Sequence, residues 1–474
     1  MNISQFYKKK IKENKNEKFL FDENFSITYQ EFDYYVNNCA KYLNSISNKE
    51  FTVMSLLPNS LDQLIIFTAS FLSGKNFCPL DCDSTHVEIQ EVLKIIKPKL
   101  IFTSSLVGGF KKIKKKKFVI KKIIVNKNLA WLKKTEKIFN QKKIGFLFIK
   151  TSGSTGKPKI IKIKISNLFK SSSNFLKFSN IPKKNYIFWN YLPMSYLGGL
   201  FNLFIIPFNL GGSIFVSKVI NGFYLLNFFN FIKRYKINIL WLIPTIIRSL
   251  STIYKNIKKF NNNEIKFAFL GTAPISLKEK KNFENKFNIN LLESYGLSET
   301  TFISCEKYTD KLRLEGSVGK IISNVKIKIN KTNREIYVKT PYLFDGYIHS
   351  DKFEKINAND YFSTKDLGSI SKGLLKIIGR KGSSIKKGGK LINLLEIENK
   401  IRDNCQVEDV VAVAISDKIY GKNYNLFIVP KHNSSPNSIN KSISNIISRS
   451  DMPNLIKFLK KLKKTKSGKV NLSE

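Results

Sequence analysis

A short stretch rich in hydroxyl side chains, glycine and lysine is the first part of the chain whose residue types could bind a ligand. It reads KTSGSTGKPKI and runs from Lys150 to Ile160. Its Thr and Ser side chains can donate hydrogen bonds, and its Lys side chains bring positive charge. Gly153 and Gly156 let the backbone approach a ligand closely. Together these groups suit a multiply charged anion, and a phosphate chain is the candidate.

The spacing within this stretch differs from that of the P-loop of nucleotide triphosphatases. A P-loop needs Gly, four residues, Gly-Lys and then Ser or Thr, and it opens a helix. Here Thr151 stands where the first Gly would be, and Pro158 follows Lys157. The segment after the stretch, IIKIKI (160–165), alternates as a strand does. We therefore predict a loop in a hairpin between two strands.

The elements around this loop follow an alternating pattern. Apolar runs typical of buried strands alternate with helix-like segments over the first 320 residues, and this predicts an α/β architecture with largely parallel sheets. The strand candidates are Phe51–Leu57, Lys99–Ser104, Lys236–Ile243 and Ile265–Gly271, with a helical stretch from about Leu61 to Leu72. After about Lys320, short alternating strands predict a small β-rich region. Residues 381–474 have an apolar pattern of their own, with a helix near 439–447.

The charge of the chain first points to a nucleic-acid or membrane partner. The formal net charge is +46 over 474 residues, but only seven of the 81 basic residues are Arg. A protein that reads phosphates or bases should use more Arg, because its planar fork binds them bidentately. The Lys residues are spread along the whole chain beside many Asn, Ile and Phe, which favours drift of an AT-rich genome. We therefore expect no nucleic-acid partner.

The expected cellular environment is a reducing, cytoplasmic one. The five Cys residues are scattered and odd in number, and the N-terminal segment lacks the apolar core of a signal peptide. An uncharged stretch of membrane length, Leu197–Val216, contains Pro207 and the pair Gly211–Gly212. We predict that it is a buried helix, a turn and a buried strand, and we expect no transmembrane segment.

The loop and several later stretches resemble the motifs of one known superfamily. Thr151–Lys159 is similar to the Thr-Ser-Gly-(Ser/Thr)-Thr-Gly-x-Pro-Lys signature of the adenylate-forming enzymes, which include acyl-CoA synthetases, peptide-synthetase adenylation domains and luciferases. Further similar stretches follow in the superfamily's order: GTAPIS (271–276), ESYGLSETT (293–301), GSVGK (316–320), TPYLFDGY (340–347), YFSTKDLGSI (361–370), GRKGSSIKKGG (379–389) and KTKSGK (464–469). The resemblance covers nearly the whole chain.

This resemblance implies a fold and a division into domains. The expected fold is α/β, with a large N-terminal domain of stacked, mostly parallel sheets with helices, a small β-rich subdomain, and a small mobile α+β C-terminal domain. The implied boundaries are 1–378 for the adenylation core, with the β-rich subdomain at about 316–378, 379–383 for the hinge and 384–474 for the C-terminal domain.

The resemblance also implies a two-step reaction. A carboxylate attacks the α-phosphorus of ATP to form an acyl-AMP and pyrophosphate, and the thiol of CoA, or of a carrier-protein pantetheine, then takes the acyl group. The implied catalytic residues are Lys469 at the α-phosphate, Ser298 as a phosphate donor, and Glu299 as the Mg²⁺ ligand. The implied nucleotide-binding residues are Thr151, Ser152, Gly153, Ser154, Thr155, Gly156, Lys157, Gly271, Thr272, Ala273, Tyr295, Asp366 and Arg380. Asp366 would bind the ribose, and Tyr295 would pack beside the adenine.

Several positions depart from the superfamily pattern, among them Ile160 and Ile165, which stand where the superfamily commonly has Gly and His. Lys365 replaces the Gly of the usual Thr-Gly-Asp. Gly382 stands where the hinge usually has Asp or Lys, so the usual side-chain latch is missing. Tyr196 stands where many acyl-CoA ligases have His.

The acid substrate is expected beside the segment LPMSYLGG (192–199). This segment contains no acidic residue that could hold an amino group, which disfavours an amino acid, and its surroundings fit a fatty or an aryl acid equally well. The residues expected to line the pocket are Trp189, Asn190, Tyr196, Gly198 and Thr300. The leading function is an ATP-dependent acyl- or aryl-acid CoA ligase. The alternatives are an enzyme that loads an acyl or aminoacyl group onto a carrier protein, and a degenerate member that binds nucleotide without catalysis.

Overall fold

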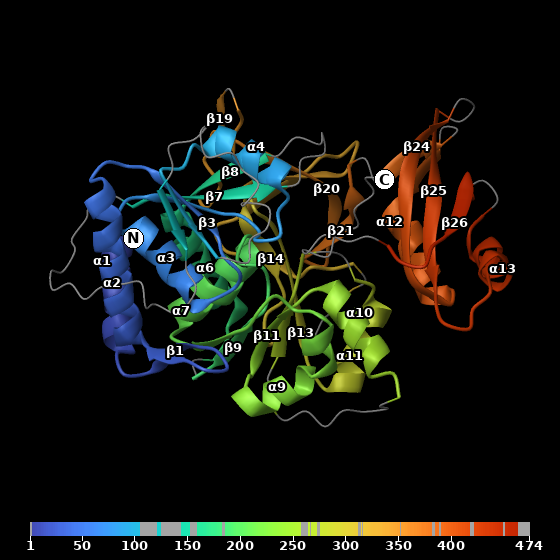
Figure 1. The fold of residues 1–474 in the computed structure, drawn as a ribbon. Coiled ribbons are helices and arrows are strands. Elements are labelled where there is room, and N and C mark those ends of the chain that lie inside the picture. Colours follow the sequence, from blue (N-terminus) through green and yellow to red (C-terminus); the bar gives the residue numbers. More distant parts are fainter. Residues whose placement is uncertain are drawn as a thin grey trace.

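The protein consists of a large N-terminal part and a smaller C-terminal part (Figure 1). The computed structural model describes residues 2–104, 121–124, 144–151, 159–182, 185–256, 264–265, 267–272, 275–310, 314, 316–350, 352–381, 384–387, 390–417, 421–448 and 451–462. Among these residues, the main hydrophobic core draws on positions from Ile3 to Leu375, and a separate core draws on positions from Ile385 to Ile447. The two cores separate within the interval that contains the predicted hinge.

Two large sheets form the N-terminal part. In the described residues, the first sheet has the order β19 (Phe353–Lys355), β18 (Gly346–Ile348), β8 (Lys159–Lys164), β7 (Phe146–Thr151), β4 (Asn76–Pro79), β3 (Thr52–Leu56), β5 (Leu100–Thr103) and β6 (Lys121–Ile124). The second has the order β15 (Lys320–Ile321), β14 (Thr301–Cys305), β13 (Leu291–Leu297), β12 (Phe267–Leu270), β11 (Ile239–Leu242), β9 (Ile187–Asn190), β10 (Ser213–Val216), β1 (Lys18–Phe21) and β2 (Ser26–Thr28). The central pairs of both sheets are parallel, as predicted.

Two smaller sheets follow. The third sheet is antiparallel and has the order β16 (Lys326–Ile329), β17 (Glu335–Lys339), β20 (Phe362–Ser371) and β21 (Leu374–Arg380). The β-rich region expected at about 316–378 is thus divided, because β15 joins the second sheet and β18 joins the first. The fourth sheet, in the C-terminal part, contains β23 (Lys390–Asn393), β22 (Ser384–Lys387), β25 (Gly421–Pro430), β24 (Val407–Asp417) and β26 (Leu455–Phe458).

Helices cover the sheets, and several begin at side-chain caps. The helices are α1 (Ile3–Glu13), α2 (Tyr29–Ile46), α3 (Leu61–Leu72), α4 (His86–Ile96), α6 (Ile165–Ser179), the π-helix η2 (Gly198–Ile205), α7 (Ile206–Leu210), α8 (Gly222–Leu226), α9 (Phe228–Tyr235), α10 (Pro244–Ile253), α11 (Leu277–Phe287), α12 (Leu394–Asn404) and α13 (Pro436–Ile446). Helices α2, α4 and α11 each start with a Ser or Thr that forms a capping box with a Glu three residues later. The expected mixed α/β fold with an α+β C-terminal part is confirmed.

The uncharged stretch 197–216 folds inside the protein. It forms η2, then α7, then a turn at Gly211, whose φ of +82° is in the left-handed region that suits glycine, and finally β10. This agrees with the prediction of a buried helix, turn and strand. Among the helices of the described residues, none is both long and apolar enough to cross a membrane.

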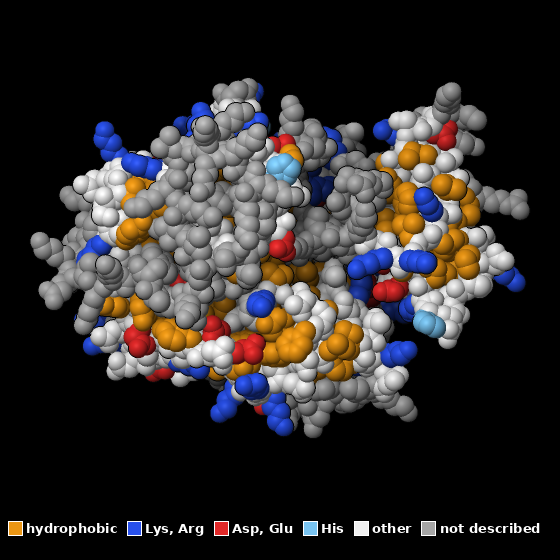
Figure 2. All heavy atoms as spheres, viewed as in Figure 1, with side chains coloured by type: hydrophobic (Ala, Val, Ile, Leu, Met, Phe, Trp, Pro, Cys, Tyr) orange, Lys and Arg blue, Asp and Glu red, His pale blue; other side chains and the backbone are white. Residues whose placement is uncertain are grey.

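On the face of the molecule seen in Figure 2, the described basic side chains are dispersed. On the face seen in Figure 2, the coloured Lys and Arg side chains lie among apolar, acidic and neutral ones and do not gather into one patch. This distribution agrees with the expectation that the net charge reflects composition.

A few polar contacts join the C-terminal part to the N-terminal part. Asp403 at the end of α12 accepts a hydrogen bond from Ser276 Oγ at 2.9 Å, and its backbone oxygen accepts one from Lys278 Nζ at 2.7 Å. Nearer to the hinge, the Asn393 side-chain amide donates to the backbone oxygen of Ile378. The C-terminal part is therefore held by exchangeable hydrogen bonds at α11 and at β21.

A buried lysine on α11 fixes the strand pair β13–β14. Lys280, which is 1% exposed, lies 2.7 Å from Glu306 and 3.2 Å from Glu293, measured from Nζ to the nearest carboxylate oxygens. Glu306 also accepts a hydrogen bond from the backbone N–H of Glu293. Removing one partner of such a buried group leaves an uncompensated charge. The contact therefore ties α11 to the strands that carry Tyr295 and Glu299.

Replacing this cation tests its structural role. Lys280→Met should lower the free energy of unfolding by about 3 kcal/mol, because both carboxylates lose their counterion while the apolar stem is kept. Urea denaturation measures this change. Lys281→Met, at an exposed neighbouring position, is the matched control and should shift stability by less than about 0.5 kcal/mol. Equal stability of the two variants would contradict this role.

Candidate active site

The hairpin that carries the hydroxyl-rich loop has the predicted form. Strands β7 and β8 are antiparallel, and Thr151 pairs with Lys159 at the end of the hairpin. The Thr151 hydroxyl donates to the backbone oxygen of Lys159 at 3.2 Å. The other loop positions predicted to bind phosphate, Ser152, Gly153, Ser154, Thr155, Gly156 and Lys157, lie outside the described residues. The structure thus gives the position of the two ends of the loop.

The turn between β13 and β14 lies close to this hairpin because of Tyr347. Strand β18 pairs with β8, and this places Tyr347 opposite Ile161. The Tyr347 hydroxyl donates to Glu299 Oε1 at 3.1 Å, and Lys159 Nζ lies 5.5 Å from the centre of the Tyr347 ring. The half-buried carboxylate of Glu299 therefore lies beside the hairpin end. Burial and the neighbouring Glu299 carboxylate raise the pKa of Tyr347, so it acts as a neutral donor.

Backbone contacts hold Glu299 and Ser298 in this turn. The backbone oxygen of Glu299 accepts from the N–H of Phe344 at 2.8 Å. The Thr300 hydroxyl accepts from the N–H of Leu297 and donates to the oxygen of Thr301, which has a positive φ of +58°. Thr300 is fully buried. Its hydroxyl therefore stabilises the turn, and the prediction that Thr300 lines an acyl pocket is not supported by this position.

A second group of predicted residues meets across three strands. The Tyr295 hydroxyl, from β13, donates to Asp366 Oδ2 at 2.7 Å, and Arg380 Nε lies 3.6 Å from Asp366 Oδ1. Asp366 and Arg380 are paired in the β20–β21 register. The backbone N–H of Asp366 donates to the Thr364 hydroxyl at 3.0 Å. Burial, followed by the Asp366 carboxylate, raises the pKa of Tyr295, so the phenol stays protonated.

This group forms a corner in which a carboxylate accepts a hydrogen bond from Tyr295 and lies beside the Arg380 cation. Asp366 is 7% exposed, whereas the Arg380 side chain is 53% exposed. The carboxylate can accept further hydrogen bonds from a ligand, and the guanidinium can turn towards one. We call Tyr295, Asp366 and Arg380 the ribose corner, after the ribose contact that the resemblance implies for Asp366.

Gly271, one of the residues predicted to bind the nucleotide, directly follows β12. A Cβ on the buried Gly271 would approach the Ser294 hydroxyl to 3.2 Å, so a side chain there would crowd the strand next to Tyr295. Thr272 is exposed and has a φ of +76°, an unusual value for a residue other than glycine. Ala273 lies outside the described residues, as do Gly382 and Lys469.

Two residues predicted to line the acyl pocket are instead enclosed in the core. Trp189 is fully buried, its indole N–H donates to Ser217, and its ring lies against Phe228 and Phe231. Asn190 is also fully buried, and its amide donates to the backbone oxygens of Gly199 and Leu203. Trp189 thus packs β9 against α9, and Asn190 ties β9 to η2. They are therefore corrected from pocket residues to core residues.

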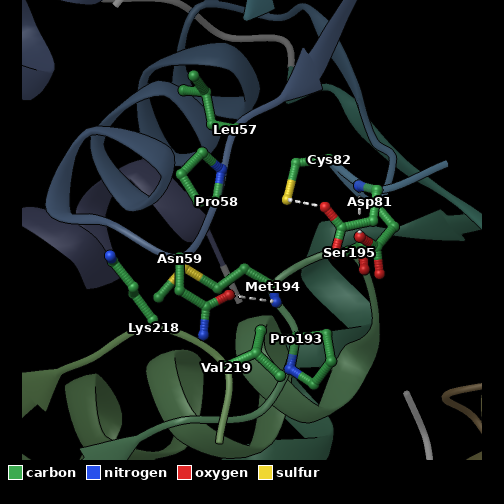
Figure 3. A pocket seen from close by; sticks show the side chains of 11 residues that line it. Leu57, Pro58, Asn59, Asp81, Cys82, Pro193, Met194, Ser195, Lys218 and Val219 are labelled. Carbon is green, nitrogen blue, oxygen red and sulfur yellow. Dashed lines mark hydrogen bonds between the residues drawn. The ribbon is translucent and has the colours of Figure 1, made fainter. Parts of the chain in front are cut away.

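The following segment does border a cavity. Tyr196 and Gly198 are half-buried, and the preceding Pro193, Met194 and Ser195 line a cavity of about 220 Å³ (Figure 3). The other lining residues are Leu57, Pro58, Asn59, Asp81, Cys82, Asp83, Lys218 and Val219. The Asn59 amide fixes the segment, because it donates to the oxygen of Leu192 and accepts from the N–H of Met194. The lining comes from the ends of β3, β4, β9 and β10, where ligands of α/β sheets bind.

Two contributors to this site, Tyr347 and Thr364, were not predicted from the sequence. Tyr347 lies in a quoted motif but was not assigned a role, although it joins Glu299 to the hairpin. Thr364 orients Asp366 and also donates to the oxygen of Ile336. Their positions in the motifs TPYLFDGY and YFSTKDLGSI were the only signals in the sequence.

Known proteins with similar sequences include CoA ligases. An acyl–CoA ligase of Bacillus subtilis, described as uncharacterized, is 26% identical over 423 residues, which is 84% of this chain and 82% of the relative. The 2-succinylbenzoate–CoA ligase of Staphylococcus epidermidis is 25% identical over 460 residues, which is 94% of this chain and 91% of the relative.

Solved structures share the fold at low sequence identity. ATP-bound MatB from Rhodopseudomonas palustris has a TM-score of 0.87 at 19% identity and covers 99% of this chain and 97% of that chain. The o-succinylbenzoate CoA synthetase from Bacillus subtilis, in complex with its acyl-adenylate intermediate, has a TM-score of 0.81 at 21% identity and covers 98% and 96%.

Family models match both parts of the chain. The model for AMP-binding enzymes matches residues 7–348, and the model for the C-terminal domain of AMP-binding enzymes matches residues 396–469. The first match alone covers well over half of the sequence. The chain therefore belongs to the AMP-binding enzyme family, within the adenylate-forming superfamily that its motifs predict.

Proposed function

We propose that this AMP-binding enzyme is an AMP-forming acid–thiol ligase that joins an acyl or aryl acid to CoA. The carboxylate of the acid attacks the α-phosphorus of ATP, which releases pyrophosphate and leaves an acyl-AMP. The thiol of CoA then displaces AMP and forms the thioester. The main supporting observation is the convergence of the hairpin end, the Glu299 turn and the ribose corner, which lie far apart in the sequence. The named CoA ligases among the relatives support the same reaction.

The ribose corner and its neighbours would bind the nucleoside. Asp366 would accept hydrogen bonds from the ribose hydroxyls, with Tyr295 fixing one of its oxygens and Arg380 close to the other. Gly271, Thr272 and Ala273 would form the opposite wall. Tyr295 would also lie beside the base.

The phosphates would lie between the hairpin loop and the Glu299 turn. The loop from Thr151 to Lys157 would donate to the β- and γ-phosphates, and Ser298 would donate to the α-phosphate. Glu299 fits Mg²⁺, because it is a half-buried carboxylate held in place by Tyr347 and Mg²⁺ prefers oxygen ligands. When bound, the ion would neutralise charge on the phosphates. Lys469 would add positive charge at the α-phosphate as the adenylate forms.

The acid would be bound beside the segment from Pro193 to Gly198. Tyr196 and Gly198 are half-buried there, and the segment carries no acidic side chain that would select an amino group. Relatives named acyl–CoA ligase and 2-succinylbenzoate–CoA ligase support an acyl or aryl acid. A carrier-protein pantetheine as the acceptor, and a member that binds nucleotide without catalysis, are the alternatives. A cytoplasmic location, where ATP and CoA are available and thiols stay reduced, belongs to the same proposal.

Pyrophosphate exchange tests the first step. With ATP, Mg²⁺ and a panel of fatty, aryl and amino acids, exchange of labelled pyrophosphate into ATP should require one class of acyl or aryl acid. Lys469→Ala should reduce exchange by at least 100-fold, which is the order of the loss when a transition-state charge contact is removed. Formation of the CoA thioester, followed by chromatography, tests the acceptor. Absence of exchange with every acid, from folded protein that binds ATP, would favour the non-catalytic alternative.

A single hydroxyl tests the ribose corner. Tyr295→Phe should weaken AMP binding about 5- to 10-fold. The substitution removes the hydrogen bond that positions Asp366, and such a bond contributes about 1 kcal/mol. Isothermal titration with AMP measures this loss. Tyr361→Phe is the control, because Tyr361 is exposed. Unchanged AMP affinity in Tyr295→Phe would contradict the assignment of this corner to the nucleoside.

A further inference from the structure

Glu335, the first residue of β17, is a buried carboxylate outside the candidate active site. Its side chain is fully buried, and both of its oxygens have polar partners. Oε2 lies 3.1 Å from Lys381 Nζ, while Oε1 accepts a hydrogen bond from Ser363 and lies 3.9 Å from Lys365 Nζ. Burial alone would raise the pKa of Glu335, but the hydrogen bonds from Ser363 and Lys381 and the two lysine charges lower it. The carboxylate is therefore ionised and needs these partners.

The partners of Glu335 are chain neighbours of the ribose corner. Glu335 pairs with Leu367 in the β17–β20 register, one residue beyond Asp366. Lys365 directly precedes Asp366, and Lys381 directly follows Arg380. The backbone N–H of Lys381 also donates to the oxygen of Lys365 at 2.6 Å. One buried carboxylate thus contacts both of the strands that carry Asp366 and Arg380.

Lys365 has an unusual backbone conformation. Its φ is +62°, in the left-handed region, where a residue with a side chain costs about 1 kcal/mol more than glycine does. The superfamily motif that this stretch resembles has Gly at this position. A glycine would adopt the same φ without strain, so the backbone conformation does not explain the lysine. The side chain, 58% exposed, approaches Glu335 with its ammonium. At that distance and exposure the pair adds little while Lys381 is also in contact.

The position of Lys381, where the chain leaves the third sheet, suggests a role for Lys365 as the second cation near Glu335. The chain leaves the third sheet at the end of β21, and the C-terminal part begins with β22 (Figure 1). The resemblance to the adenylate-forming enzymes implies that the C-terminal part rotates about this connection, which would change the backbone at Lys381. Such a rotation would break the N–H bond from Lys381 to Lys365 and separate Lys381 from Glu335. A buried carboxylate without a cation is costly, so another cation is needed in the rotated state.

We infer that Glu335 is a positioning residue that orders the ribose corner and the hinge, and that Lys365 is the reserve cation that keeps Glu335 paired when Lys381 moves away. This inference rests on the proposed function, in which Asp366 and Arg380 bind the nucleotide, and on the hinge and mobile C-terminal domain that the resemblance to the adenylate-forming enzymes implies. The Glu335–Lys381 ion pair would then hold the hinge in place of the side chain that Gly382 lacks. Lys365 then has a reason to occupy a position that glycine would fill without strain.

Hydrogen exchange of the Lys381 amide tests the positioning role without any need for activity. Glu335→Gln keeps the shape but removes the charge, and the exchange of this amide in the protein without ligands should become at least 10-fold faster. Glu13→Gln, in an exposed pair on α1, is the matched control and should leave it unchanged. Lys381→Gln should accelerate exchange as well, which guards against a folding defect of one variant. Rates equal to those of the control in both variants would overturn the inference.

A pair of lysine-to-glycine variants tests the reserve cation. In Lys365→Gly, pyrophosphate exchange with the identified acid should change less than 2-fold, whereas transfer from the acyl-AMP to CoA should slow about 10-fold. Lys372→Gly is the matched control, because Lys372 also has a positive φ, +51°, and lies in the exposed β20–β21 turn. Equal rates of both steps in the two variants would show that Lys365 has no such role. If the unaltered enzyme catalyses no exchange at all, the proposed function fails, and the amide-exchange comparison still decides the role of Glu335.

Discussion

A carboxylate that leaves water must gain cations or hydrogen-bond donors to stay charged, and three such carboxylates organise the region around the candidate active site of this enzyme. Glu306 is held by Lys280, which ties α11 to the strands of the Glu299 turn. Asp366 is held by Tyr295 and lies next to Arg380, which joins the second sheet to the third. Glu335 is held by Lys381 at the end of the last strand before the C-terminal part. Each contact links elements that local hydrogen bonding leaves separate.

The pairing of β18 with β8 in the first sheet likewise links elements that are distant in the sequence, at the end of the β7–β8 hairpin. Because β18 pairs with β8, Tyr347 comes to lie between Lys159 and Glu299. A hairpin from the middle of the chain and a turn 140 residues later in the sequence thereby form one surface. The tyrosine hydroxyl orients the carboxylate without neutralising it, which leaves an oxygen ligand that suits a hard cation.

The use of arginine and lysine also depends on whether a charge is buried or exposed. Where an ion pair is partly buried and needs two parallel bonds, the chain uses Arg, as in the contact of Arg248 with both oxygens of Glu279. Most of the remaining positive charge is Lys on the surface, where solvent and salt weaken its interactions. The large net charge therefore says little about partners.

Several features of the protein were determined by its sequence alone. The alternation of Ile160–Ile165 predicted the hairpin, the apolar stretch at Leu61–Leu72 predicted α3 to the residue, and the order of the motifs predicted the superfamily. These signals are local, because strand and helix periods are set by neighbouring residues. Only the tertiary structure decided that Trp189 and Asn190 lie in the core, that Thr300 bonds within its own turn, and that Tyr347 and Glu335 hold parts of the site. Those outcomes depend on which strands become neighbours, and a side chain's partners across a sheet are not encoded in the residues beside it.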